Sequence, residues 1–95
     1  MIVCACIKII PTENPKDVMY VCGVRHGDCY STMEHMNLPR KGDRIQTEGF
    51  MTHKNEFLDR FEAYDHVLMC GQITATARMF KVKNEETELY SEDLW

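Results

Sequence analysis

The chain has 95 residues, a length that fits one domain, and its hydrophobic content of 44% and charged content of 27% argue against disorder over the whole chain. Its net charge of −4 argues against binding to duplex DNA or RNA, because such proteins present a basic face, but allows a small anionic ligand held by a few arginines.

The first part of the chain predicts two strands followed by a short helix. Residues 1–10 are rich in β-branched side chains and apolar on both faces, which is typical of a central strand, and the run is too short to span a membrane. Residues 11–17 predict a loop and residues 18–22 a second strand. A helix is expected over residues 28–36, with Asp28 as its N-cap.

The middle of the chain predicts a hairpin and the clearest helix. Strands are expected over residues 45–52 and 56–58, joined by a tight turn. Asp59 is a good N-cap, and Glu62 follows it at the spacing of a capping box. Gly71 is a good residue to follow the end of this helix.

The last quarter of the chain gives a weaker signal. Residues 73–82 fit a strand, a loop or a continuation of the helix. Residues 84–88 form an acidic, solvated run, and residues 89–95 form an amphipathic end that can dock back. The order β-β-α-β-β-α predicts an α+β fold in which one antiparallel sheet carries both helices on one face. We expect a single domain over residues 1–95, with residues 84–95 as a C-terminal tail.

Basic residues lie at both places where a strand gives way to a helix. Arg25 and His26 precede the first predicted helix, and Asp59 and Arg60 open the second. Free backbone N–H groups and the helix dipole make such junctions suitable for phosphate. The alternative for Arg25 and His26 is a surface arginine beside a histidine packed under the turn. Arg60 opposes the helix dipole, which indicates another use, with an anion or a carboxylate.

Aromatic, cysteine and histidine residues give less specific signals. Phe50 and Phe57 flank the predicted hairpin, where they serve as core residues or, alternatively, as a stacking surface for a base. The five cysteines have no disulfide-framework spacing, which indicates buried thiols in a reducing cytosol. Cys29 is close to His26 in sequence, but a free cysteine is usually a small buried hydrophobe. Without CxxC, HxxxH, Walker or GxGxxG motifs, we expect no metal site, no cofactor and no catalytic residue.

Several segments taken together resemble a known family. They are Val24–His26, Cys29–Met33, Gly49–Thr52, Phe57–Ala63, Gly71–Gln72 and Leu89–Trp95. In this order they resemble the type 1 Thoeris anti-defence proteins, a family of small bacteriophage proteins. The resemblance implies a sponge that binds cyclised ADP-ribose signals, and in some members cyclic oligonucleotides of the related CBASS pathway, without cleaving them. It also implies a sheet with two helices, assembled as a homodimer or a trimer of dimers with ligand at the subunit interfaces.

The resemblance also implies roles for individual residues. Arg25 and His26 would lie near phosphate and ribose, Phe57, Asp59 and Arg60 would line the pocket, and the segment at Tyr90 would close it. The candidate ligand-binding residues are therefore Arg25, His26, Phe50, Phe57, Asp59, Arg60 and Tyr90.

We expect a phage protein that sequesters a cyclic nucleotide signal in the cytoplasm of the infected bacterial host, with no binding to membranes or duplex nucleic acid. Two alternatives remain open. The first is a protein–protein inhibitor of a host defence factor, anchored by Tyr90, Leu94 and Trp95. The second is a hydrolase of the nucleotide signal, with His26 and a carboxylate as acid and base.

Overall fold

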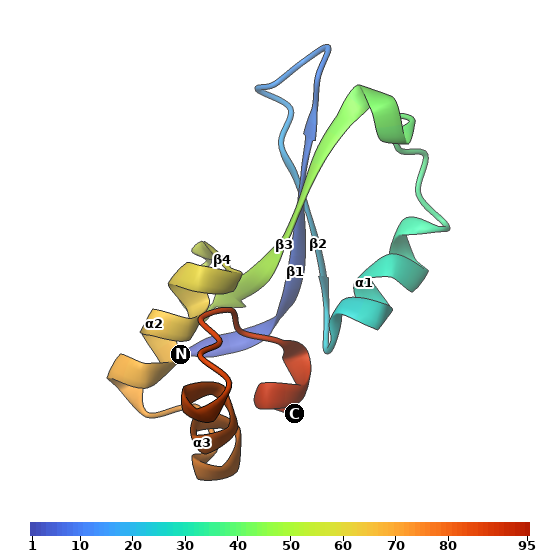
Figure 1. Cartoon of the computed structure of the whole chain (residues 1–95). Coiled ribbons are helices and arrows are strands. Elements are labelled where there is room, and N and C mark those ends of the chain that lie inside the picture. Colours follow the sequence, from blue (N-terminus) through green and yellow to red (C-terminus); the bar gives the residue numbers. More distant parts are fainter.

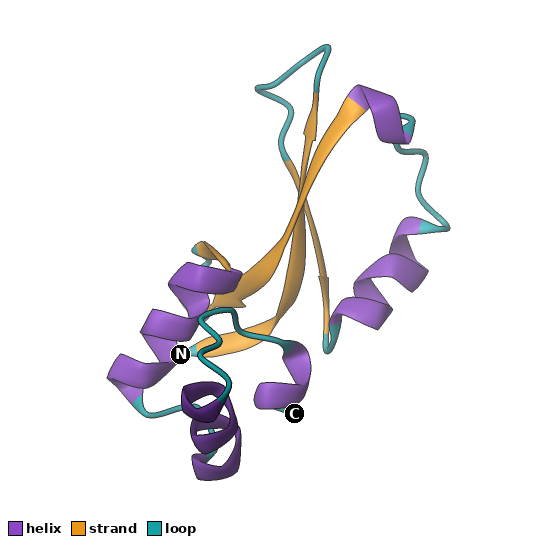
Figure 2. Cartoon of the chain, in the orientation of Figure 1, coloured by secondary structure: helices purple, strands orange, loops and turns teal.

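The computed structural model describes residues 1–95. It contains one antiparallel sheet of four strands, in the order β2-β1-β3-β4 (Figure 1). The strands are β1 (Ile2–Pro11), β2 (Met19–Gly23), β3 (Arg44–Thr52) and β4 (Phe57–Asp59). The helices are α1 (His26–Met33), α2 (Arg60–Cys70) and α3 (Ala75–Lys83), with short 3-10 turns η1 (Lys41–Asp43) and η2 (Ser91–Asp93) (Figure 2). The α+β class and the antiparallel sheet are confirmed, and the chain has three helices rather than two.

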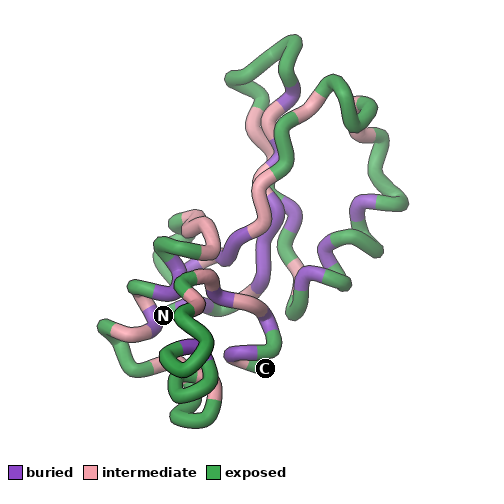
Figure 3. Tube along the Cα trace, viewed as in Figure 1, coloured by how far each residue is buried: buried purple, intermediate pink, exposed green.

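β1 is a central strand, as its two apolar faces predicted, because it pairs with both β2 and β3. Ala5, Ile7 and Ile9 alternate along it and are all fully buried on one face of the sheet. A bulge between Ile2 and Cys4 inserts one extra residue, which keeps Ile2 on that same face. Buried positions therefore recur along β1 from Ile2 to Ile9, and Figure 3 shows buried and partly buried positions along the strand.

Two helices and the C-terminal segment cover this face. α1 packs along β1 and β2, whereas α2 packs against β3 and β4. The resulting core contains Ile2, Ala5, Ile7, Ile9, Val21, Cys29, Met33, Phe50, Ala63, Tyr64, Val67 and Leu89. The expected docking of the tail is thus confirmed, because Leu89 lies in the core and its N–H donates to the carbonyl oxygen of Arg60 at 2.9 Å.

The caps explain where the helices begin. Asp59 accepts hydrogen bonds from the N–H groups of Phe61 and Glu62 at 3.0 and 2.8 Å, and Glu62 accepts one from the N–H of Asp59, so the predicted capping box is confirmed. Gly71 ends α2 in the left-handed conformation, with φ of 73°. Asp28 is not the cap of α1: it lies inside the helix and accepts a hydrogen bond from the N–H of Arg25 at 3.1 Å.

The boundaries of the other helices differ from the predicted ones. α1 begins two residues earlier than expected, at His26, and ends at Met33 rather than residue 36. The ambiguous region after Gln72 is a separate helix, α3, whose start is capped by Thr74 through the N–H of Ala77 at 3.1 Å. No helix of the fold combines the length and apolar character needed to cross a membrane.

Candidate functional site

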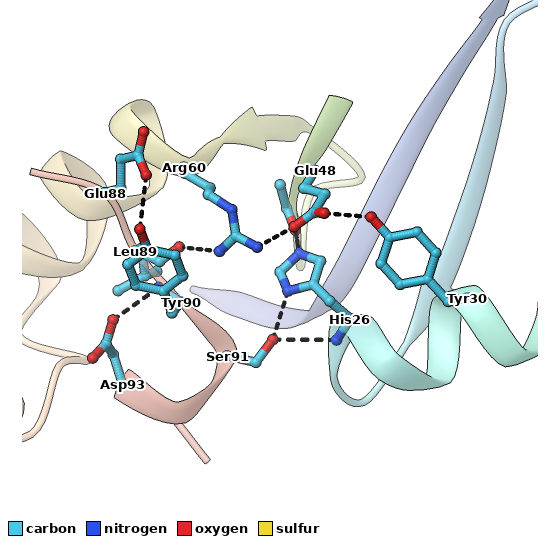
Figure 4. A network of polar contacts seen from close by, with 10 residues as sticks. His26, Tyr30, Glu48, Arg60, Glu88, Leu89, Tyr90, Ser91 and Asp93 are labelled. Atoms are coloured by element: carbon cyan, nitrogen blue, oxygen red, sulfur yellow. Dashed lines mark hydrogen bonds and ion pairs between the residues drawn. The ribbon is translucent and has the colours of Figure 1, made fainter. Parts of the chain in front are cut away.

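His26 joins three parts of the fold at the start of α1. Its Nδ1 lies 2.7 Å from the hydroxyl of Ser91 in η2, and its Nε2 lies 2.7 Å from the carbonyl oxygen of Gly49 in β3 (Figure 4). Because a carbonyl only accepts, Nε2 carries the proton and Nδ1 accepts from the hydroxyl. Burial lowers the pKa of His26 against the opposing effect of the Gly49 carbonyl, so the ring is a neutral link between strand, helix and tail.

Glu48 is the centre of a second set of polar contacts on the same side of the sheet. Its two carboxylate oxygens accept hydrogen bonds from the Tyr30 hydroxyl and from Nη2 of Arg60 (Figure 4). Burial favours the neutral acid, but the hydrogen bonds from Tyr30 and Arg60 outweigh it and lower the pKa of Glu48. Burial and the bond to Glu48 raise the pKa of Tyr30, which remains the donor. Arg60 therefore has the carboxylate partner that its unfavourable place in the helix indicated.

Arg60 also holds the tail. Its Nη1 donates to the carbonyl oxygen of Leu89 at 2.7 Å, and its guanidinium stacks 4.6 Å from the ring centre of Tyr90. The Tyr90 hydroxyl donates to Glu88 at 2.9 Å, and this bond, followed by burial, raises the pKa of Tyr90. A groove of about 460 Å³ opens beside this stack, lined by Gln46, Thr47, Glu48, Asp59, Arg60, Phe61 and Glu88.

Lys81 is a further residue of this region that the sequence did not single out. It belongs to α3, its side chain is 1% exposed, and its ammonium lies 2.7 Å from Asp93 and 2.6 Å from the carbonyl oxygen of Glu88. Its Nζ also lies 4.8 Å from the ring centre of Tyr90 and 5.7 Å from that of Tyr64. This buried lysine is the only buried residue of α3, and it ties the helix to the tail.

The structure gathers only part of the predicted site. His26, Arg60 and Tyr90 lie among the polar contacts drawn in Figure 4, together with Glu48, Tyr30 and Ser91, which were not predicted. Asp59 is used as the cap of α2. Arg25 is exposed and binds the main-chain oxygen of Trp95.

The two predicted aromatic residues lie on opposite faces of the sheet. Phe50 is fully buried with its ring 5.0 Å from that of His26, so core residues rather than a ligand surround it. Phe57 pairs with Met51 on the other face, where its ring lies 5.9 Å from that of Tyr20. A single slot lined by Phe50, Phe57 and Arg60 is therefore not formed in this chain.

The Ser91–His26 pair has the contact of a nucleophile and its base, but not the access. Ser91 and His26 are 5% and 8% exposed, and neither lines a described cavity. A substrate could not approach the serine oxygen without opening the fold. Burial and the neighbouring Cys22 raise the pKa of Cys29 to about 11, which does not favour a thiolate nucleophile. No group of three or more His, Cys, Asp or Glu side chains is placed to hold a metal ion.

The charged side chains that line two cavities affect whether an anionic ligand such as a phosphate can bind there. In the groove beside Arg60, three carboxylates (Glu48, Asp59 and Glu88) accompany one guanidinium. A second cavity, of about 590 Å³, is lined by Thr74, Thr76, Ala77, Phe80, Glu86, Tyr90, Glu92 and Asp93, with no cationic side chain among them. Both cavities would therefore repel a phosphate unless its charge were balanced.

A sequence signal existed for only some of the missed residues. Glu48 lies on the same face of β3 as the buried Phe50, so strand alternation could have placed it near α2. Lys81 follows Phe80 in a helix of alternating charge and apolar residues, where a lysine ordinarily faces solvent.

Comparison with known proteins identifies the family. A model of the phage T4 y16D protein family matches residues 1–95, and the chain belongs to this family. No curated protein and no solved structure gives a significant match. The phage origin implied by the sequence resemblance is thus confirmed, whereas the match carries no link to Thoeris anti-defence.

Proposed function

We propose that this member of the phage T4 y16D family acts by stoichiometric binding, without turnover, and that α3 docks it on an acidic surface of another protein. One observation carries the proposal: α3 presents Met79, Phe80 and Val82 to solvent, with exposed fractions of 73, 57 and 67%. Arg78 and Lys83 flank them and are also exposed. In Figure 3 most of α3 is drawn as exposed.

The composition of this surface supports the proposal. Exposed apolar side chains gathered on one element mark interaction sites more often than chance placement does. Methionine, aromatic and arginine side chains are enriched where proteins bind one another. On α3 the exposed charged residues are Arg78 and Lys83, both basic, in a chain whose net charge is −4. An acidic partner therefore complements α3, and its approach is steered by charge.

The anchor differs from the one that the sequence indicated for a protein–protein inhibitor. Leu94 is only partly exposed, and it packs against the core. Tyr90 stacks on Arg60 within the fold. The tail thus supports its own domain, and the neighbouring α3 offers the more accessible apolar side chains.

The test uses the full chain and a matched pair of variants. Proteins captured from infected host cells are purified and titrated one by one against wild type, Phe80→Asp and Phe61→Asp. Phe61 is a suitable control because it is 54% exposed on α2, outside α3. We expect a 1:1 complex whose Kd rises about 30-fold or more in Phe80→Asp, the size of a hot-spot residue, and changes little in Phe61→Asp.

Charge provides a second readout. Lys83→Glu should slow association, and the wild-type association rate should fall as salt rises. Equal binding by wild type and Phe80→Asp would refute the proposal, as would self-association through α3 with no heterologous complex.

A second candidate function is sequestration of a cyclic nucleotide signal, either cyclised ADP-ribose or a cyclic oligonucleotide. The observation in its favour is the stack of Arg60 on Tyr90 at the edge of a groove. A guanidinium can bind phosphate through two parallel hydrogen bonds, and an aromatic ring can stack on a base. A phosphate at this place must displace Glu48 from Arg60 or arrive with a cation, and a homo-oligomer could supply further cationic residues.

Titration calorimetry with glycocyclic ADP-ribose and with a cyclic dinucleotide tests this second candidate. Arg60→Gln should abolish binding, whereas the exposed Arg78→Gln should not, and ligand released by heat should be recovered intact. Absence of heat with wild type, or recovery of a cleaved product, would exclude sequestration. Sedimentation of the same samples reports whether a dimer or trimer of dimers forms.

A further inference from the structure

Two cysteine thiols meet across neighbouring strands on the face of the sheet opposite the core. Cys6 of β1 and Cys22 of β2 are directly opposed in the strand register, and their Sγ atoms lie 3.7 Å apart. Cys4 lies two residues from Cys6 and points to the same face by strand alternation. All of these cysteines are free thiols.

We propose that Cys6 and Cys22 form a redox modification site, which closes to a disulfide by exchange with a small-molecule disulfide such as oxidised glutathione. This site is independent of the binding surface on α3.

The backbone already satisfies the requirements of such a bond. Directly opposed residues of antiparallel strands have Cα atoms about 4.5–5.5 Å apart, within the range that disulfides span. Closing the bond therefore requires the two side chains to rotate, but not the strands to move. The register of β2 against β1 extends from Ala5–Gly23 to Ile9–Met19, so the pair lies within a continuous ladder rather than at a frayed end.

Access differs between the two thiols in the way that an exchange reaction needs. Cys22 is exposed, whereas Cys6 is fully buried. The Cys22 thiolate can attack one sulfur of the glutathione disulfide, which gives a Cys22–glutathione mixed disulfide and releases one glutathione thiolate. Cys6, whose Sγ lies 3.7 Å away, can then attack the Cys22 sulfur and expel the second glutathione.

The overall reaction is balanced. Two protein thiols and one glutathione disulfide give one protein disulfide and two glutathione thiols, so two electrons pass from the protein to glutathione. Burial, followed by the effect of Cys22, raises the pKa of Cys6. Cys6 is therefore a slow second nucleophile, and the mixed disulfide at Cys22 should be seen as an early intermediate.

The Cys6–Cys22 pair lies close to the start of α1, where His26 makes its hydrogen bonds. Cys22 precedes Gly23, whose Cα lies so close to α1 that an added Cβ would be 2.9 Å from the N of Cys29. A Cys6–Cys22 bond would fix the end of β2 to β1 immediately before α1 begins.

The experiment exposes the native full chain, and the same chain in urea, to a fixed ratio of oxidised to reduced glutathione. After quenching and alkylation, peptide mapping by mass spectrometry locates each modified thiol. In native wild type we expect a linked peptide pair containing Cys6 and Cys22, formed to a larger extent than in urea. Exposed Cys70, which has no thiol neighbour in the structure, serves as an internal control and should carry only glutathione.

Two variants make the result decisive. Cys4→Ala should retain the Cys6–Cys22 bond, and Cys22→Ala should leave Cys6 reduced, because it is buried. The proposal is overturned if wild-type Cys22 stops at the mixed disulfide as Cys70 does. It is also overturned if Cys4 is the partner of Cys22, or if the bond forms no more readily in the native chain than in urea.

Discussion

Replacing Lys81 with methionine tests the most unusual interaction in the fold. The substitution keeps most of the unbranched side chain but removes an ammonium that lies 2.7 Å from Asp93 and 2.6 Å from the carbonyl oxygen of Glu88. Removing one partner of a buried ion pair typically costs about 3–5 kcal/mol, because the other charge is left buried. Asp93 is 11% exposed and keeps a hydrogen bond from the N–H of Tyr90 at 2.8 Å, which favours the lower end of that range.

We therefore expect the free energy of unfolding to fall by about 3 kcal/mol and, for a domain of this size, the Tm to fall by roughly 12–24 °C. Urea and thermal unfolding followed by circular dichroism measure both quantities. Lys83→Met is the matched control: the same substitution on an exposed residue of α3 should change stability by less than about 0.5 kcal/mol. If the two variants unfold alike, Lys81 is not the residue that holds α3 and the tail together.

Three further predictions concern the sheet and its polar contacts. Gly49→Ala should prevent folding, because its Cβ would lie 2.2 Å from a carbonyl oxygen of β4, whereas Gly42→Ala, with nothing within 4 Å, should melt within a few degrees of wild type. Since the pKa of Glu48 is lowered from 4.5, the stabilisation by its carboxylate is complete above pH 4.5 and is lost as the pH falls through the folded-state pKa. In urea titrations at a series of pH values, Glu48→Gln should therefore lack this part of the loss of stability in acid. Burial lowers the pKa of His26 from 6.5, so the same experiment should show stability falling below pH 6.5 in wild type, with a smaller slope in His26→Gln. An unchanged slope in either variant would refute the corresponding assignment.

The parts of the fold that could be predicted are those encoded by neighbouring residues. The N-cap and C-terminal glycine of α2 act over one helical turn, so Asp59, Glu62 and Gly71 were sufficient to place it. The apolar run of β1 likewise predicted a central strand from residues that are neighbours in the sequence. α1 was misplaced by two residues because an acidic residue can cap a helix from outside or from its first turn, and Asp28 does the latter.

The site was harder to predict because it depends on register and on distant contacts. Phe50 and Phe57 both flank the hairpin, but the pairing of Phe50 with Leu58 puts Phe57 on the opposite face. The length of the turn sets that register, and the composition of the strands does not. His26 meets Ser91 across 65 residues of sequence, and no local pattern reports such a contact.

The burial of Lys81 has a consequence for binding. α3 offers exposed apolar side chains to a partner, but Lys81 is its only buried residue, so the shape of the proposed docking surface depends on a residue that does not face the partner. A helix that is not fixed in place must be ordered on binding, and this ordering opposes association. Lys81→Met should therefore weaken the complex even though Lys81 makes no contact with the partner. Addition of saturating partner should restore part of the Tm that the variant has lost, because a partner that binds only the folded form stabilises that form. Partner titrations monitored by thermal unfolding give both values for one sample. A variant that binds as tightly as wild type, with α3 disordered by hydrogen exchange, would show that α3 is not the docking element.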